Sequence, residues 1–259
     1  VVVTIPYKKN AFAMCDELTA CASDTGAVNT VVFREDGTSL GANTDVYGFE
    51  YMLKSSGIDP AGKKVLILGT GGASAAVNTA LKVMGAGDIS FVSRKGEINY
   101  DNVYELCEDA QIVVNCTPVG MYPKIDAAPV DIGKFNKLEA VADIIYNPSC
   151  TKLLYDAKKA GLKTAGGLKM LVAQAFKASA FFKGSKDDEE AESMISADDI
   201  EKVTSALERQ MKNVTVIGMP GSGKTWLARK LGEHLNREVV DLDDEFTAVY
   251  GKTPSQTIK

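Results

Sequence analysis

Short apolar runs alternate with segments of helical composition through the middle of this chain. Between residues 59 and 166 the apolar runs lie at 65–68, 89–92, 111–114, 141–145 and 162–164. The segments of helical composition lie at 74–84, 100–108 and 151–160, with a shorter turn near 131–138. Strands that alternate strictly with helices form parallel sheets whose faces the helices cover. The pattern therefore predicts an α/β fold with a doubly wound parallel sheet.

The same pattern predicts further elements on either side of this region. They are a strand at 1–5, helices at 11–18, 47–56, 168–182 and 196–211, and strands at 214–217 and 239–243. The acidic run Asp187-Asp188-Glu189-Glu190 has no aromatic neighbours, which is typical of a solvated linker. In the helix at 196–211, Ile200, Val203 and Leu207 form one apolar stripe, so this helix is expected to pack on a neighbouring domain.

A hairpin is predicted where Asp36-Gly37 separates two β-rich runs. With these two residues at the centre of the turn, Asn29 is expected to pair with Thr44. Asn29 would then lie beside Thr44 and Asp45 where the hairpin opens. Polar side chains gathered there indicate either a binding site or the ordinary polarity of a sheet edge.

A glycine-rich turn follows the apolar run at 65–68 directly and leads into a helix. Its sequence is Gly69-Thr70-Gly71-Gly72-Ala73-Ser74. Glycines let the backbone approach a pyrophosphate, and the N–H groups of the following helix then face that anion. The turn predicts a dinucleotide-binding corner. Because Ser74 stands at the third glycine position of the usual motif, a tight turn without a ligand is the alternative.

The end of the second strand of this fold bears on the type of nucleotide. NAD-binding proteins usually place an acidic residue there, where it holds the ribose 2′-hydroxyl. This chain has Ser93-Arg94-Lys95 instead. A hydroxyl and two cations can bind a 2′-phosphate, which favours NADP, and two simply solvated cations are the alternative.

A second nucleotide-binding pattern begins at residue 213. The strand predicted at 214–217 leads into Gly218-Met219-Pro220-Gly221-Ser222-Gly223-Lys224-Thr225, which fits the P-loop pattern, and a helix is expected at 226–235. Backbone N–H groups around Gly221, Ser222 and Gly223 would hold the phosphates of ATP. Lys224 would reach the terminal phosphates, and Thr225 would ligate Mg²⁺.

The composition limits the classes of function. A hydrophobic fraction of 45% and a charged fraction of 24% over 259 residues are typical of a soluble globular protein. The net charge of −5 argues against a broad nucleic-acid surface, and no apolar run is long enough to span a membrane. Five scattered cysteines without metal-binding spacing favour reduced thiols in the cytoplasm. The chain begins Val1-Val2-Val3, so we expect it to be a fragment of a longer protein.

Proton transfer near the first nucleotide site needs a group other than histidine. The single histidine, His234, lies on the predicted P-loop helix. Lys8 at the end of the first strand and Asp45 at the hairpin mouth form the natural pair, because a lysine held against a carboxylate can transfer a proton. An exposed surface amine is the alternative interpretation of Lys8.

Together these residues resemble the shikimate dehydrogenase family. The matching stretches lie within residues 1–184 in the family's order and are Val3-Thr4-Ile5-Pro6-Tyr7-Lys8, Gly26-Ala27-Val28-Asn29-Thr30, Asn43-Thr44-Asp45, Gly69-Thr70-Gly71-Gly72-Ala73, Asn115-Cys116-Thr117-Pro118-Val119-Gly120-Met121, and Gly167-Leu168 with Met170-Leu171-Val172-Ala173-Gln174. The resemblance implies NADP-dependent reduction of 3-dehydroshikimate to shikimate in aromatic amino acid biosynthesis.

The resemblance also implies roles for individual residues. Lys8 and Asp45 would be the catalytic pair. The residues implied in substrate binding are Thr4, Asn29, Thr44, Tyr146 and Gln174. The residues implied in NADP binding are Gly69, Gly71, Gly72, Ala73, Ser93, Arg94, Lys95, Thr117, Met121 and Gly167. The family's first βα segment, with its Ser-x-Ser carboxylate clamp, is not among these residues.

The segment from Asn213 resembles the beginning of shikimate kinase. The resemblance rests on the P-loop and Asp241-Leu242-Asp243. It implies ATP and Mg²⁺ as ligands, with Asp241 near the metal and Asp243 on a shikimate hydroxyl. The family's arginine clamp, second glycine motif and lid have no counterpart here, so we expect no kinase activity.

These resemblances give an expected domain plan. It has a partial shikimate-binding domain at 1–58, an NADP-binding Rossmann domain at 59–166, a helix returning to the substrate domain at 167–184, an acidic linker and helix at 185–212, and a P-loop kinase fragment at 213–259. The partners expected are small molecules, and the chain is expected to be a monomer or a homodimer. The alternatives are a quinate-preferring relative, a methylene-tetrahydrofolate dehydrogenase of the same fold, and a nucleotide-binding fragment without turnover.

Overall fold

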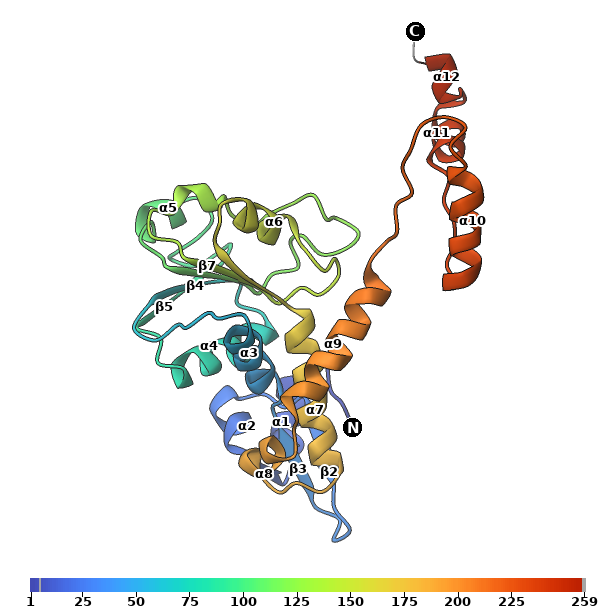
Figure 1. The fold of residues 1–259 in the computed structure, drawn as a ribbon. Coiled ribbons are helices and arrows are strands. Elements are labelled where there is room, and N and C mark those ends of the chain that lie inside the picture. The colour runs from blue at the N-terminus through green and yellow to red at the C-terminus, as the bar shows by residue number, and fades with distance from the viewer. Residues whose placement is uncertain (5, 258–259) are drawn as a thin grey trace. The chain divides into compact units, whose positions relative to one another are not determined.

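The computed structural model describes residues 1–4 and 6–257 of the chain. They form two compact units, Val1–Met211 and Lys212–Lys259, which are described separately (Figure 1). The first unit contains most of the elements predicted up to residue 211, and the exceptions lie within residues 1–18. The boundary predicted at 58/59, between a substrate domain and a cofactor domain, stays a prediction.

A five-stranded parallel sheet is the centre of the first unit. Its strands are β4 (Lys64–Leu68), β5 (Asp88–Val92), β6 (Ile112–Asn115), β7 (Ala140–Asp143) and β8 (Lys163–Gly166), in the order β5-β4-β6-β7-β8. The connecting elements are α4 (Gly72–Val83), α5 (Val103–Leu106), η1 (Ile132–Lys134) and α6 (Lys152–Lys159). The parallel, doubly wound fold predicted from the alternating pattern is confirmed. The strand order reverses between β4 and β6, and ligands bind at such a point in open α/β sheets.

Alternate residues of β4 show why this strand is apolar throughout. Val65 and Ile67 pack in one buried cluster together with α3 (Asp45–Ser55) and α4. Leu66 and Leu68 pack in a second cluster on the opposite face, with residues of α5 and α6. Figure 1 shows these helix pairs on the two sides of the sheet. Both faces are covered, as the unbroken apolar runs require.

A small three-stranded sheet precedes this fold. Its strands are β1 (Glu17–Leu18), β2 (Thr30–Phe33) and β3 (Ser39–Ala42), and helices α1 (Lys8–Met14) and α2 (Ala20–Thr25) flank it. The helix predicted at 11–18 therefore begins and ends earlier, and its last residues form β1. The strand predicted at 1–5 is reduced to a single bridge between Val2 and Thr30, and Ile5 lies outside the described residues.

The predicted hairpin forms, but its register is wrong by one residue. Thr30 pairs with Ala42, so position 29 lies opposite position 43 rather than 44. The turn is longer than two residues, because Arg34 N donates to Thr38 O at 2.8 Å. Gly37 has φ +87°, and this left-handed residue after a tight turn inserts one extra position into the loop.

Helix α7 (Leu168–Phe182) follows the parallel sheet in sequence and packs against α3, which precedes that sheet. Gly48 allows a close approach, since a Cβ there would lie 2.6 Å from Met170 O. Helix α9 (Ala197–Met211) packs on α7 through Ile200, which is fully buried with Leu168 and Val172. The predicted packing of the apolar stripe is confirmed for Ile200 and Leu207, whereas Val203 is 40% exposed. Helix α7 belongs to the same compact unit as α9, so the prediction of a separate neighbouring domain is not confirmed.

The acidic run is not the solvated linker that its composition predicts. It contributes α8 (Asp188–Ser193), which lies against α7. The fully buried Lys177 Nζ lies 3.0 Å from Asp188 Oδ1 and 2.6 Å from Glu192 Oε1. Asp188 and Glu192 therefore pair with a buried cation. The acidic composition of the run could not predict this, because Lys177 lies outside the run.

The second unit contains α10 (Lys224–Leu235), α11 (Leu242–Tyr250) and α12 (Pro254–Thr257). The helix predicted after the P-loop is confirmed. The strands predicted at 214–217 and 239–243 are wrong, because the structure has no strand in either segment. Isolated strands are not stable without pairing partners, and Ile217 remains 85% exposed. The carboxylate of Asp241 instead caps α11 by accepting from Asp243 N.

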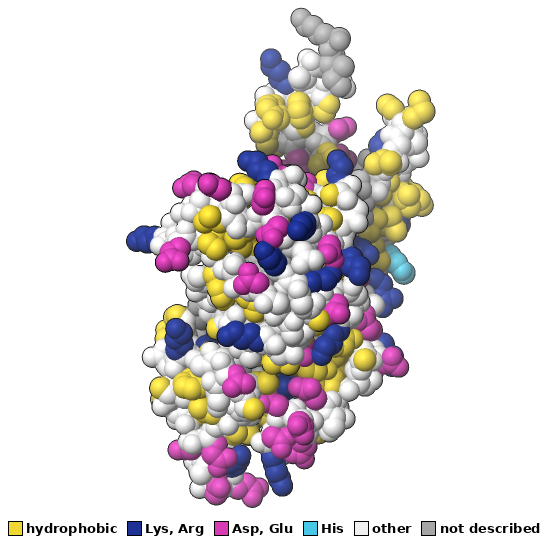
Figure 2. Space-filling model, turned by 90° about the vertical axis from the view of Figure 1, so that its left-hand side faces the viewer, with side chains coloured by type: hydrophobic (Ala, Val, Ile, Leu, Met, Phe, Trp, Pro, Cys, Tyr) yellow, Lys and Arg dark blue, Asp and Glu magenta, His cyan; other side chains and the backbone are white. Residues whose placement is uncertain are grey.

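The surface carries both basic and acidic side chains, as the charged fraction of the sequence indicates. In the face shown in Figure 2, basic and acidic side chains are interspersed over the first unit. No helix in the described part of the chain is long and apolar enough to cross a membrane. All five cysteines are free thiols.

Candidate active site

Lys8 and Asp45 form a direct ion pair, as the sequence predicts. Lys8 begins α1 and Asp45 begins α3, and Lys8 Nζ lies 2.6 Å from Asp45 Oδ2. Both side chains are largely buried, with exposed fractions of 15% and 12%. Asn29 Nδ2 donates to the other carboxylate oxygen at 2.9 Å. An ammonium held in this way can give a proton to a neighbouring oxygen and take a proton back from solvent.

Further polar groups surround this pair at the mouth of the hairpin. Asn29 Nδ2 also donates to Thr44 Oγ1 at 3.0 Å, and Asn29 Oδ1 accepts from Thr44 N at 3.0 Å. Thr44 Oγ1 donates to Gln174 Oε1 of α7 at 3.2 Å. Five of the predicted site residues thus lie together, namely Lys8, Asn29, Thr44, Asp45 and Gln174. They offer hydroxyl, amide and charged groups suited to a substrate with several hydroxyl groups.

Asn43 supports this cluster, although the sequence pattern alone assigned it no role. Its Oδ1 accepts from Asp45 N at 3.1 Å, and its Nδ2 donates to Ala27 O at 2.9 Å. It therefore joins the first turn of α3 to the segment before β2. Its place directly before Thr44-Asp45 is the only signal of this role in the sequence.

The other predicted substrate residues lie at the ends of neighbouring elements. Thr4 is exposed and its carbonyl accepts from Tyr7 N. Tyr146 follows β7 and is 48% exposed. Among the described residues neither has a hydrogen bond to the Lys8–Asp45 pair. Gly167 is the N-cap residue of α7, and a Cβ there would lie 2.1 Å from Ile144 O, so only glycine fits.

The glycine turn follows β4 at the point where the strand order reverses. Gly69 has φ +95°, and its N–H donates to Val92 O at the end of β5. A Cβ on Gly69 would lie 2.9 Å from Thr117 Cγ2, so this turn contacts the loop that follows β6. Gly71 and Gly72 are exposed at the start of α4 and have open space around Gly71. This helix N-terminus can receive a pyrophosphate.

The cationic residues lie beside this turn. Ser93 follows Val92 directly, and Arg94 and Lys95 are exposed. Neither cation has an ion pair within the described part of the chain. Both remain available for a phosphate. Thr117 is partly buried and Met121 is 46% exposed on the loop after β6.

A buried carboxylate lies beneath that loop. Asp143 ends β7, and burial raises its pKa to about 6, while hydrogen bonds from Thr151, Ile145 N and Asn115 oppose the shift. Burial also raises the pKa of the neighbouring Cys116 thiol, and the charge of Asp143 adds to that effect. Sequence reasoning did not single out Asp143, and its only signal is an acid closing an apolar strand.

The comparisons with known proteins agree with this geometry. A family model described as the shikimate dehydrogenase substrate binding domain matches residues 1–31. A shikimate dehydrogenase (NADP⁺) of Clostridium beijerinckii is 40% identical over 188 residues, which are 68% of this chain and 68% of the relative. This chain belongs to the shikimate dehydrogenase family.

Solved structures of the shikimate dehydrogenase family share this fold. A chorismate mutase/shikimate 5-dehydrogenase fusion protein from Clostridium acetobutylicum has a TM-score of 0.74 at 34% identity, covering 82% of this chain and 78% of its own. The enzyme of Thermus thermophilus in complex with NADP(H) and shikimate has a TM-score of 0.63 at 32% identity, covering 75% and 78%.

The second unit lies outside the dehydrogenase resemblance. A shikimate kinase family model matches residues 220–259. In the P-loop, Gly221 and Gly223 have positive φ, and Lys224 Nζ donates to Met219 O at 2.9 Å. Thr225 Oγ1 lies 3.5 Å from Asp241 Oδ2. The described residues contain no group of three or more side chains arranged to hold a metal ion.

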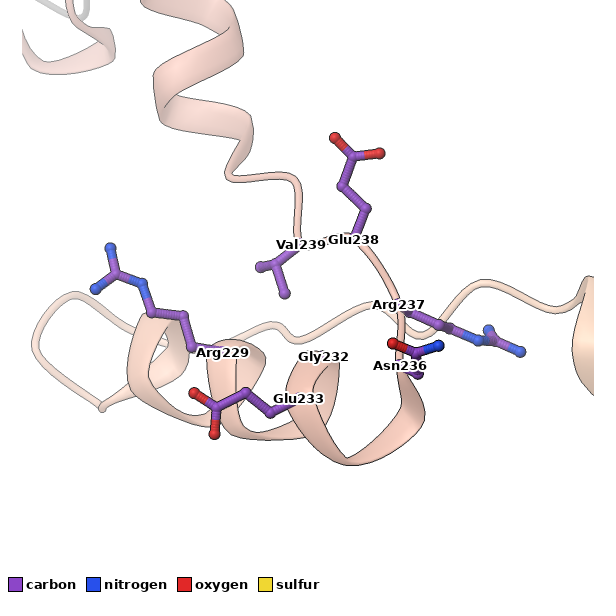
Figure 3. A pocket seen from close by; sticks show the side chains of 7 residues that line it. All are labelled: Arg229, Gly232, Glu233, Asn236, Arg237, Glu238 and Val239. Atoms are coloured by element: carbon purple, nitrogen blue, oxygen red, sulfur yellow. The ribbon is translucent and has the colours of Figure 1, made fainter.

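A depression of about 550 Å³ lies near the C-terminal end of α10. Its lining residues, shown in Figure 3, are Arg229, Gly232, Glu233, Asn236, Arg237, Glu238 and Val239. The P-loop is at the N-terminal end of the same helix. This depression is therefore not part of the predicted phosphate site, and neither Asp241 nor Asp243 lines it.

Proposed function

We propose that the chain reduces 3-dehydroshikimate to shikimate with NADPH. The observation that carries this proposal is the Lys8–Asp45 ion pair, at 2.6 Å, in a chain of the shikimate dehydrogenase family. The relatives' names include NADP⁺, and the exposed Arg94 and Lys95 supply the charge that a 2′-phosphate needs.

NADPH, when bound at the glycine turn, would supply the hydride that the ketone carbon receives. The new C–H bond converts the carbonyl oxygen into an alkoxide, which takes a proton from Lys8 Nζ. Asp45 holds the ammonium of Lys8 in place and stabilises its charge, and Asn29 fixes the carboxylate through its second oxygen. Because Lys8 is partly exposed, solvent can return the proton to it.

The remaining predicted residues complete this proposal. Thr4, Asn29, Thr44, Tyr146 and Gln174 hold the substrate. Gly69, Gly71, Gly72 and Ala73 accommodate the pyrophosphate, Ser93, Arg94 and Lys95 the 2′-phosphate, and Thr117, Met121 and Gly167 the remainder of the cofactor. In the second unit, Gly221, Ser222, Gly223 and Lys224 hold ATP phosphates, Thr225 and Asp241 hold Mg²⁺, and Asp243 contacts a shikimate hydroxyl. The five free thiols support a cytoplasmic protein. We expect this protein to act as a monomer or a homodimer.

Replacing Lys8 tests the reaction. Lys8→Ala should lower kcat by roughly 10²–10⁴-fold, the effect of losing a general acid, while NADPH still binds. Lys9→Ala is the matched control, because Lys9 is exposed on the same helix. Turnover is followed by NADPH absorbance with 3-dehydroshikimate, and the reverse reaction with shikimate and with quinate shows the substrate preference. A Lys8→Ala protein as active as the Lys9→Ala control would refute the role of Lys8.

A further inference from the structure

Asp143 is fully buried yet accepts three hydrogen bonds. Asn115 Nδ2 donates to its Oδ1 at 3.1 Å, and Ile145 N donates to the same oxygen at 3.0 Å. Thr151 Oγ1 donates to Oδ2 at 2.7 Å. Asn115 and Thr151 are fully buried as well. A carboxylate is costly in such a place unless its hydrogen bonds are satisfied, and here they are.

Asn115 connects this carboxylate to the loop that follows β6. Its Oδ1 accepts from Thr117 N at 3.0 Å and from Thr117 Oγ1 at 2.7 Å. An asparagine amide can point either way, and its partners decide the orientation. The Asp143 carboxylate, at 3.1 Å, and the Val119 carbonyl, at 3.3 Å, both accept from Asn115 Nδ2. Together they hold the NH₂ group of Asn115 and turn its amide oxygen toward Thr117.

The loop held in this way borders the glycine turn. Thr117 Cγ2 occupies the space next to Gly69, since a Cβ at that glycine would lie only 2.9 Å from it. The same carboxylate oxygen of Asp143 also holds the N–H of Ile145 at the exit of β7. Two residues further on, Asn147 O accepts from Tyr122 N at 3.1 Å. Asp143 thus joins both loops at this edge of the sheet.

We propose that Asp143 is a positioning residue for the nicotinamide cofactor. It fixes the amide of Asn115, and through Asn115 it holds the Thr117 loop against the glycine turn where the cofactor binds. This inference rests on the proposed function, which makes NADP the ligand of that turn.

The surroundings of Asp143 contain few groups that titrate. β6 ends with Asn115, and the Cys116 thiol follows it directly. β8 presents the backbone of Gly166, and Thr151 is the N-cap of α6. No ion pair to Asp143 occurs within the described ranges 1–4 and 6–257. Its hydrogen bonds, rather than an opposite charge, therefore determine what it does.

Two substitutions at Asp143 distinguish the loss of its hydrogen bonds from a change of the side chain that retains an acceptor. Asp143→Asn retains an oxygen acceptor for Asn115, and its new NH₂ group can donate to Thr151 Oγ1. Asp143→Ala removes both carboxylate oxygens and leaves the Asn115 NH₂ group with the Val119 carbonyl as its acceptor. We expect Asp143→Ala to raise KM for NADP by about tenfold or more, a loss of about 1.4 kcal/mol, and to leave KM for shikimate within about threefold. Asp143→Asn should remain within about threefold of the parent for both.

Equal increases in the two KM values for Asp143→Ala, or equal impairment by Asn and Ala, would overturn the proposal. Fluorescence titration with NADPH gives the same comparison without turnover. A parent that binds NADPH but does not turn over would count against the proposed function alone, and the titration would still decide the role of Asp143.

A variant at Asn115 tests the proposal if Asp143→Ala does not fold. Asn115→Asp keeps the acceptor for Thr117 but places two carboxylates in contact, and such a pair binds one proton tightly at low pH. We expect the Kd for NADPH of this variant, divided by that of the parent at the same pH, to be at least about tenfold larger at pH 8 than at pH 6. Circular dichroism at both pH values shows that the fold is retained. Affinity of Asn115→Asp that does not change with pH would overturn the proposal.

Discussion

At the scale of single residues, Arg94 is the side chain on which the choice of cofactor depends. It follows β5 where NAD-binding proteins carry an acid, and it is exposed without an ion pair among the described residues. We expect Arg94→Asp to reverse or abolish a preference for NADP over NAD. Arg34→Asp, on the hairpin turn, is the control of equal charge change. The ratio of kcat/KM for the two cofactors is the measurement, and equal values in the parent would contradict the assignment.

Asp143 gives a second prediction at this scale, for stability. Its folded pKa of about 6 lies above the roughly 3.9 of an unfolded aspartate. The folded state therefore binds a proton more tightly than the unfolded state between these values. The stability from that proton is complete below about pH 4 and is lost as the pH rises through 6, a change of about 2–3 kcal/mol. Asp143→Asn should remove this pH dependence.

Urea unfolding at about pH 4.5 and pH 7 provides the measurement. The difference in unfolding free energy between parent and Asp143→Asn isolates this carboxylate, because all other titrating groups are common to both proteins. A difference that stays constant between the two pH values would show that Asp143 titrates normally.

The residue scale also shows what the sequence could predict. The hairpin signal predicted that Asn29 lies beside Thr44 and Asp45, and this contact forms despite a one-residue error in register. Lys8 lies outside the hairpin, and its pairing with Asp45 was predicted from its place after the first strand and from the family resemblance. Asp143 was missed, because a contact between the ends of two parallel strands depends on strand order. That order appears only when the sheet is assembled.

At the scale of elements, α8 is the clearest case in which composition was misleading. Burial alone lowers the pKa of Lys177, but Asp188 and Glu192 outweigh that effect and raise it. The Lys177 ammonium also lies 5.4 Å from the centre of the Tyr47 ring. The ion pairs with Asp188 and Glu192 attach α8 to α7, the helix that carries Gln174.

Removing the buried cation should therefore destabilise the first unit. Lys177→Met leaves Asp188 without its partner, and we expect a loss of about 2–3 kcal/mol, below the full cost of breaking a buried pair because Glu192 is half exposed. Lys183→Met, at the exposed end of the same helix, should change stability by less than about 0.5 kcal/mol. The pKa of Lys177 is raised in the folded state. Its contribution to the free energy of unfolding is therefore retained at neutral pH and is lost as the pH rises through this raised pKa. Urea denaturation of both variants provides the comparison.

The strand predictions show the limit of local pattern. Val65 to Leu68 has an apolar pattern similar to that of Val214 to Ile217, yet only the first is a strand. β4 has β5 and β6 as partners, whereas the described residues of the second unit offer 214–217 no partner strand. Pairing and burial decide whether an apolar run becomes a strand, and neither is a property of the run itself.

At the scale of the whole molecule, the two units differ in how well they bury apolar side chains. The first has large buried clusters on both faces of its sheet. In the second, Met219 is 79% exposed, Trp226 is 67% exposed and Leu242 is 74% exposed. A unit with so little core has little stability of its own. The P-loop therefore belongs to a unit of low stability.

We expect residues 213–259 to give no shikimate kinase activity in this chain. Phosphoryl transfer needs the acceptor held in line and the developing charge stabilised, commonly by arginine. The arginines of this segment are Arg229 and Arg237, both beside the depression near the C-terminal end of α10 rather than at the P-loop. Lys224 Nζ is bonded to Met219 O and would have to leave it to reach a phosphate.

The measurement is coupled ADP release with shikimate and Mg-ATP, comparing the parent with Lys224→Ala. Lys230→Ala, on the exposed face of α10, controls for loss of charge. Both variants and the parent should give only the background rate. ADP release that requires shikimate and is lost in Lys224→Ala but retained in Lys230→Ala would show that the P-loop, with Thr225 and Asp241 beside it, is sufficient for phosphoryl transfer.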